Sequence, residues 1–235
     1  MIPLRDANPS SRTPWVTFLL IGLNILAFLY EVALPAPRLE QLIFTMGMVP
    51  ARVTVFPADP AVTFGDAFLP LFSSMFLHGG WLHLIGNMWF LWIFGDNIED
   101  RLGHLRYLLF YLVCGLGAGV AHTLFNLNST VPTIGASGAV AGVLGGYLLL
   151  FPHARILTLI PVFVLSMTEL PAYIVLLLWF VIQLFSGTAS LGARDASAGG
   201  VAWWAHIGGF LLGLALVKLF ARAPPRVTYR VVDEP

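Results

Sequence analysis

Three short segments carry side chains that can act together in acyl transfer. Ser137 lies in the segment G-A-S-G (135–138), and a serine hydroxyl becomes a nucleophile when a neighbouring base takes its proton. His206 has the side-chain type that serves as this base near neutral pH. His83 and Asn87 are four residues apart, so on a helix both project from one face and can donate hydrogen bonds to an oxyanion. These residues predict a hydrolase with a Ser–His dyad, in which the backbone N–H of Ser137 is a further oxyanion donor.

The composition determines the environment of these residues. Hydrophobic residues make up 58% and charged residues 10% of the 235-residue chain, against ~45–50% and ~25% in soluble domains. So few charges cannot cover a soluble body of this size, and the chain is predicted to be an integral membrane protein. Twelve Lys and Arg balance twelve Asp and Glu without a basic patch, which argues against a nucleic-acid partner. The one cysteine, Cys114, allows no internal disulfide.

Six apolar stretches are long enough, or nearly so, to cross ~30 Å of hydrocarbon as helices. The connector between the first two, 35–80, is expected to lie in the membrane interface or to dip into it. Residues 156–167 are expected to form an interfacial hairpin or a helix extension rather than a seventh span. The chain is interpreted as one domain, 1–235, with a short polar N-terminal segment (1–14) and a polar C-terminal tail (223–235). The predicted spans are 15–34, 81–98, 105–125, 137–151, 170–185 and 202–220.

Positive charge predicts the orientation of the spans. With six spans, both termini and the even-numbered connections lie on one side of the membrane, and that side carries nine of the twelve Lys and Arg residues. Because positive charge stays in the cytoplasm, both termini are predicted to be cytoplasmic. The starts of spans two, four and six, where the polar residues lie, then face outward. The nine are Arg5, Arg12, Arg101, Arg106, Arg155, Lys218, Arg222, Arg226 and Arg230, and the other side has Arg38, Arg52 and Arg194.

Small residues place the serine and the histidine in register. The fourth stretch has about fifteen residues, or ~22 Å of helix, so Ser137 at its start is expected to lie below the outer membrane surface. Residues four apart in the fourth and sixth stretches form small-xxx-small patterns, which allow two membrane helices to approach closely. Packing of these faces would bring the hydroxyl and the imidazole within hydrogen-bond reach. The small residues are Gly138, Gly142 and Gly146 in one stretch, and Ala205, Gly209 and Gly213 in the other.

Each polar residue also has a structural interpretation. Serine is a favoured residue at helix starts, and a single membrane histidine can simply bond to a carbonyl of a neighbouring helix. Ligation of a metal or haem by His78, His83 and His206 is disfavoured, because a hydrolytic zinc site often needs a carboxylate and none is available at this depth. The register of the glycines with both polar residues favours catalysis.

The segments H-G-G-W-L-H-L-I-G-N (78–87), G-A-S-G (135–138) and A-H-I-G-G-F-L-L-G (205–213) together resemble the motifs of rhomboid intramembrane serine proteases. The resemblance covers nearly the whole chain and implies an all-α bundle of six transmembrane helices. It implies Ser137 as the nucleophile, His206 as the general base, and an oxyanion hole formed by His83, Asn87 and Ser137. It implies no metal or cofactor. Residues with implied structural roles are His78, Gly135, Gly138, Gly209 and Gly213, and Glu99 with Arg101 as a pair that ties the cytoplasmic end of span two.

Two positions depart from the family pattern. Leu69-Pro70 stands where some members carry Trp-Arg, and Ala141 stands where some carry a tyrosine that stacks on the histidine. The orientation of the imidazole must then come from elsewhere, with Trp203, Trp204 or an aromatic residue on another span as candidates.

The predicted function is cleavage of peptide bonds in or near the transmembrane segments of single-span membrane proteins. The expected surroundings are the lipid bilayer of the cell membrane, with the active site towards the extracytoplasmic side. One alternative is a derlin-like protein that binds membrane clients without cutting them. A second is a small transporter or channel, which the apolar lower parts of spans two and four disfavour.

Overall fold

Each of the six predicted spans overlaps one helix in the computed structural model, which describes residues 1–162, 164–191 and 201–222. Within these residues, four helices are long and apolar enough to cross a membrane, and a fifth candidate arises if α5 and the helix before it, 78° apart, form one broken span. The shorter apolar helix is α7. Three of the basic residues that were used to predict the orientation lie outside the described residues. They are Arg194, and Arg226 and Arg230 in the tail 223–235. The six helices are α1 (Trp15–Ala33), α5 (Trp81–Leu102), α6 (His104–Phe125), α7 (Ser137–Leu150), α8 (Ala172–Ser190) and α9 (Trp203–Phe220).

Proline and glycine set the ends of these helices. Pro14 precedes α1, and Pro35 precedes the next helix, which is separated from α1 by two extended residues. Gly103 follows α5 with a φ of +81°, a conformation that side chains other than glycine rarely adopt. Because α6 begins at the very next residue, α5 and α6 reverse direction within one residue.

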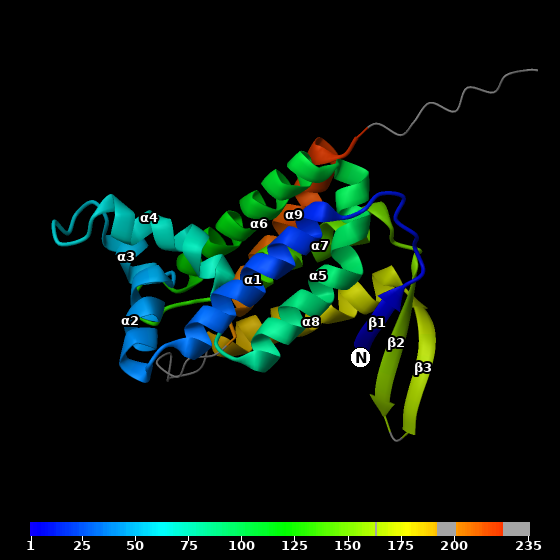
Figure 1. The fold of residues 1–235 in the computed structure, drawn as a ribbon, viewed down its shortest axis with the longest axis horizontal. Coiled ribbons are helices and arrows are strands. Elements are labelled where there is room, and N and C mark those ends of the chain that lie inside the picture. Colours follow the sequence, from blue (N-terminus) through cyan, green and yellow to red (C-terminus); the bar gives the residue numbers. More distant parts are fainter. Residues whose placement is uncertain (163, 192–200, 223–235) are drawn as a thin grey trace, which may run out of the picture.

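The central helix of the bundle is α7 (Figure 1). All ten residues from Gly138 to Tyr147 are buried, which fits a sequence that is apolar on every side. The surrounding helices contribute large rings to the same core. The largest fully buried side chains include Phe94 of α5, Tyr107, Phe110 and Tyr111 of α6, Tyr147 of α7, and Phe210 of α9.

The connector between α1 and α5 folds into α2 (Ala36–Met46), α3 (Pro50–Val55), α4 (Phe64–Ser73) and the 3-10 turn η1 (Ser74–Phe76). These elements project from one side of the bundle (Figure 1). The connector is bonded to the loop that precedes α7: the Gly135 N–H donates to the Ser74 carbonyl at 2.9 Å, and Met48 and Thr133 exchange two backbone hydrogen bonds. It therefore braces the start of the central helix.

The prediction of an all-α fold is wrong in one region, because three strands form an antiparallel sheet in the order β1-β2-β3. The strands are β1 (Ile2–Asp6), β2 (Arg155–Val162) and β3 (Val164–Pro171), and they lie on the opposite side of the bundle from α2–α4 (Figure 1). Of the two structures expected for 156–167, a hairpin or a helix extension, the structure has the hairpin, which is formed by β2 and β3. What the sequence did not reveal is β1, because its partner strand is about 150 residues away, with Asp6 opposite Ile156.

Two side chains of the bundle anchor β1. The Trp89 Nε1–H donates to the Pro3 carbonyl at 2.7 Å, and the Tyr147 hydroxyl donates to Asp6 Oδ2 at 2.6 Å. The polar N-terminal segment is thus part of the folded domain rather than a free extension.

The predicted contact between the small residues of α7 and α9 is confirmed. A Cβ atom added at Gly209 would lie 2.0 Å from the Gly138 carbonyl oxygen, and one added at Gly213 would lie 2.0 Å from the Gly142 oxygen. At these points the backbones of the two helices touch, which only glycine permits. The contact begins one residue after Ser137 and three residues after His206, so it sets the distance between their backbones.

Substitution of Gly213 by alanine is expected to lower the free energy of unfolding by about 1–3 kcal/mol, because the added methyl group forces two backbones apart. The measurement is unfolding in detergent micelles, followed by tryptophan fluorescence. Gly22→Ala on α1 is the matched control: its Cβ meets no atom within 4 Å, so its effect should stay below about 1 kcal/mol. Equal stability of the two variants would contradict the packing described here.

Candidate active site

Ser137 and His206 lie at adjacent helix starts and share a hydrogen bond. Ser137 is the first residue of α7 and His206 is in the first turn of α9, and the Ser137 Oγ lies 2.7 Å from His206 Nε2. The imidazole is buried, with 9% of the residue exposed, whereas Ser137 is only partly covered. A hydroxyl at this distance can pass its proton to the imidazole.

A side chain from α8 completes this arrangement. His206 Nδ1 lies 2.8 Å from Gln183 Oε1, and Gln183 is buried. An amide oxygen can only accept, so Nδ1 carries the hydrogen, and Nε2 is left with the lone pair that faces the serine. The tautomer required of a general base follows from this bond.

Gln183 is the residue that sequence reasoning missed. Its signal was present, since it is a strongly polar residue within an apolar helix, and such residues are costly unless they have a partner. Aromatic rings were expected to orient the imidazole instead. Trp179 and Trp203 do flank it, with ring centroids 6.0 and 6.2 Å away, but Trp204 stacks on Phe125.

His83 of α5 presents a hydrogen-bond donor near the serine, and Asn87 lies four residues further along the same helix. His83 Nδ1 accepts from the Gly79 N–H at 3.3 Å, so in the neutral ring Nε2 carries the hydrogen. The Asn87 amide nitrogen is buried and has no partner among the described residues. A buried donor without a partner is costly, which makes it a good candidate to bind an oxygen supplied by a ligand.

Gly135 leaves room for His83 beside the serine. Its φ is +130°, and a Cβ at this position would lie 2.7 Å from His83 Nε2 and 3.6 Å from Ser137 Oγ. The His83 donor and the serine hydroxyl therefore border one small space. Any larger residue at position 135 would fill that space and strain the backbone.

His78 and Glu31 hold the start of α5. The His78 N–H donates to both carboxylate oxygens of Glu31, at 3.1 and 3.3 Å, and Glu31 is only 2% exposed. The His78 ring packs edge-on against His83, with centroids 5.1 Å apart. Glu31, near the end of α1, was not singled out in the sequence, although a carboxylate in an apolar stretch is a comparable signal.

Glu99 ties the far end of α5 to α1, but Arg101 takes no part in this tie. The carboxylate accepts from the backbone N–H groups of Val16 and Thr17 and from the Thr17 hydroxyl, each at 2.8 Å. It thereby caps the N-terminus of α1, whose N–H groups have no partner within the helix. Among the described residues Glu99 has one ionic partner, His104 at 2.6 Å, and no bond joins it to Arg101.

Nothing in the described ranges forms a metal-binding cluster, since no group of three His, Cys, Asp or Glu side chains is placed to hold an ion.

The chain is similar in sequence to known proteins. Residues 66–223 match the family model of the Rhomboid domain. The chain is 34% identical to RHOMBOID-like protein 5 of Arabidopsis thaliana, over 62% of this chain and 42% of that protein. It is 33% identical to the rhomboid protease GluP of Bacillus subtilis (strain 168), over 57% of this chain and 24% of that protein. It is also 30% identical to RHOMBOID-like protein 6, mitochondrial, of A. thaliana, over 66% of this chain and 44% of that protein.

The matched part of the chain spans less than half the length of each of these three relatives. The match to the family model covers the helices that carry all four polar residues of the site, from α5 to α9. The apolar helices and this match together make the chain a multi-pass integral membrane protein, and it belongs to the rhomboid family.

Proposed function

We propose that this chain is an intramembrane serine endopeptidase in which Ser137 is the nucleophile and His206 the general base. The observation that carries the proposal is the chain of two hydrogen bonds, from Ser137 Oγ to His206 Nε2 and from His206 Nδ1 to Gln183 Oε1. A serine that merely capped its helix would not need a histidine held in the tautomer of a base. A B. subtilis relative is named a rhomboid protease, which agrees with this chemistry.

In the first half-reaction, Ser137 Oγ attacks the carbonyl carbon of the scissile peptide while its proton passes to His206 Nε2. The carbonyl oxygen becomes an oxyanion, for which the Ser137 N–H, the His83 Nε2–H and the Asn87 amide are the available donors. Collapse of the tetrahedral intermediate breaks the C–N bond, and His206 gives the proton to the leaving amine. The product is an acyl ester on Ser137.

In the second half-reaction, water replaces the amine. His206 takes a proton from the water, the hydroxide adds to the ester carbon, and the same donors receive the new oxyanion. The C–O bond to the serine then breaks, and Oγ recovers its proton from the imidazolium. Gln183 acts throughout as a positioning residue, because its amide oxygen touches only the imidazole.

The proposed substrates are single-span membrane proteins cut in or near the transmembrane segment. A peptide carbonyl in an intact helix is hydrogen-bonded within the helix, so a substrate must unwind locally before Ser137 can reach it. Substrates with glycine or proline near the scissile bond should therefore be preferred.

For the topology we infer six spans with both termini in the cytoplasm. The starts of α5, α7 and α9, which carry the polar site, lie at one end of the bundle, and the ends of the same helices lie close to Arg101, Arg155 and Arg222. Since positive charge stays in the cytoplasm, the site faces the extracytoplasmic side of the cell membrane. This arrangement counts α7, although short, as a span.

Ser137→Ala and His206→Ala are each expected to reduce cleavage of a reconstituted single-span substrate by at least about 10³-fold, because the nucleophile and its base act as a unit. Cleavage is measured by gel and mass spectrometry in proteoliposomes. The matched controls are Ser166→Ala on β3 and His153→Ala after α7, both exposed and remote from the site, which should cleave like the parent. If the parent chain binds the substrate but never cuts it, the client-binding alternative replaces the protease.

Gln183→Leu is expected to reduce kcat by about 10–100-fold with little change in KM, because the imidazole loses the bond that fixes its tautomer. Gln183→Glu should retain more activity and move the acidic limb of the pH profile upward, since a carboxylate stabilises the imidazolium. Gln41→Leu on α2, at an exposed position, is the control. A Gln183→Leu enzyme with the parent's kcat and pH profile would show that the glutamine does not position the base.

A further inference from the structure

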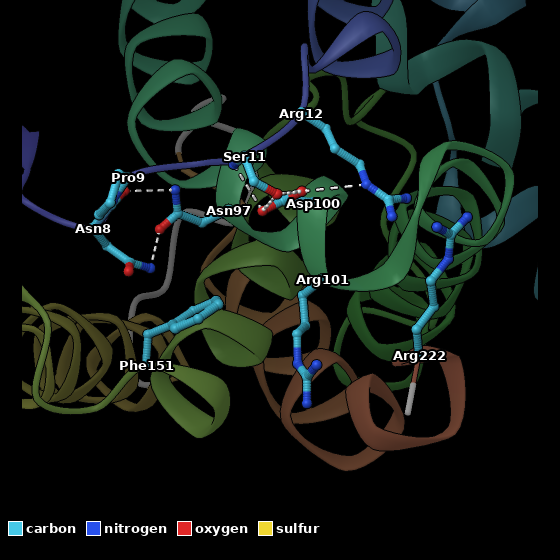
Figure 2. Close-up of a pocket in the computed structure, with 9 residues that line it drawn as sticks. All are labelled: Asn8, Pro9, Ser11, Arg12, Asn97, Asp100, Arg101, Phe151 and Arg222. Carbon is cyan, nitrogen blue, oxygen red and sulfur yellow. Dashed lines mark hydrogen bonds and ion pairs between the residues drawn. The ribbon is translucent and has the colours of Figure 1, made fainter. Parts of the chain in front are cut away.

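A cavity lies at the other end of the bundle from the serine. It has a volume of about 260 Å³ and lies where the chain enters α1, where α5 ends, and where the chain leaves α7 and α9 (Figure 2). None of its lining residues takes part in the proposed chemistry. They are Asn8, Pro9, Ser11, Arg12, Asn97, Asp100, Arg101, Phe151 and Arg222.

The lining carries an excess of positive charge. Arg12, Arg101 and Arg222 come from three separate segments, and Asp100 is the single acidic residue among the lining side chains. Asp100 is partly neutralised, since its carboxylate lies 3.8 Å from Arg12 Nε and accepts from the Ser11 N–H and hydroxyl. Among the described residues, no carboxylate lies within 4.0 Å of Arg101 or Arg222.

Two of the three arginines are joined through the backbone, and two have guanidinium groups on the same side of the cavity. The Arg222 N–H donates to the Arg101 carbonyl at 3.2 Å, which ties the end of α9 to the end of α5. The guanidinium groups of Arg12 and Arg222 lie on the same side of the cavity in Figure 2, and that of Arg222 lies directly over Gly103. Like charges so arranged repel each other unless an anion lies between them.

Hydrogen bonds within the protein hold the rim of the cavity in place. Asn97 and Asn8 bond to each other through their side chains, and Asn97 Nδ2 also donates to the Asn8 carbonyl at 3.0 Å. Together with the bonds between Ser11 and Asp100, these contacts fix residues 8–12 against the end of α5. A ligand would therefore meet an ordered site.

Large apolar side chains flank each arginine on the outer surface. Each arginine has an exposed apolar residue three or four positions away in the sequence. These residues are Trp15, Leu105 and Leu219, which are 65%, 70% and 77% exposed. In a membrane protein such residues contact lipid, so the arginines lie where hydrocarbon gives way to headgroups. A ligand at this depth is most readily supplied by the bilayer itself.

We propose that this cavity binds a phosphate group, and that the group is the headgroup phosphate of an anionic lipid in the leaflet at this end of the bundle. Guanidinium groups match the geometry of phosphate oxygens and bind them through paired, charge-assisted hydrogen bonds. Because the site joins the start of α1 to the ends of α5 and α9, a bound lipid would also stabilise the contact between these three helices.

The test is native mass spectrometry of the purified chain released from detergent micelles that contain phosphatidylglycerol or phosphatidylcholine. The parent chain should retain one molecule of phosphatidylglycerol in preference to phosphatidylcholine. Arg101→Gln with Arg222→Gln should weaken this retention by about tenfold or more, since each removes a charged hydrogen-bond donor. Arg106→Gln is the matched control, because Arg106 is exposed near the same end of the bundle but does not line the cavity.

A second arm separates the lipid from a free anion. In this arm, binding of inorganic phosphate is compared between the parent chain and the double variant. If phosphate binding depends on Arg101 and Arg222 but the chain shows no preference for phosphatidylglycerol, the cavity is a phosphate site and the lipid is overturned as the source of the phosphate. Equal retention of both lipids by all variants, together with no phosphate binding, would overturn the proposal.

A third variant guards against misfolding of the double substitution. Asp100→Asn removes the one acidic lining residue and keeps an acceptor for Ser11, so it should retain phosphatidylglycerol at least as well as the parent. Loss of retention in this variant, with circular dichroism unchanged, would contradict a site governed by positive charge. Ser137→Ala should bind lipid like the parent, so this test is independent of proteolysis.

Discussion

The direct contact between the backbones of α7 and α9 is the constraint on which the rest of the structure depends. Gly138 and Gly142 lie against Gly209 and Gly213 so closely that a single added methyl group would overlap a carbonyl oxygen. The side chains of serine and histidine are short. The Ser137 hydroxyl and the His206 imidazole, each in the first turn of its helix, lie 2.7 Å apart because the two helix backbones are in contact. The large rings of α5 and α6 then fill the space around this pair of helices.

Polar groups inside the bundle are few, and three of them fasten one helix to another. Glu31 holds the start of α5 from α1, Glu99 holds the start of α1 from α5, and Gln183 joins α8 to α9. In lipid, an unpaired polar group is costly, so each of these bonds favours the packing of one particular helix against another. Asn87 is one of several buried side chains with no partner in the described part of the chain, and its amide nitrogen is a proposed oxyanion donor.

The sequence was sufficient where the signal is local. Ser137 and His206 stood out because of their flanking glycines, and the glycine spacing correctly predicted which two helices touch. It was insufficient where the partner is distant: Gln183 lies 23 residues before His206, and nothing within α8 shows which helix that side chain faces. The strand β1 was missed for the same reason, because it is five residues long and gains its structure from β2 and from Trp89 and Tyr147.

The central claim is that Ser137 is an activated nucleophile, and reaction with a fluorophosphonate probe tests it most directly. The purified chain in detergent would be treated with the probe, digested, and the modified residue located by mass spectrometry. The account predicts one adduct, on Ser137, that is absent when His206 is replaced by alanine. A folded parent chain that carries no adduct on Ser137, or an adduct that persists without His206, would contradict it.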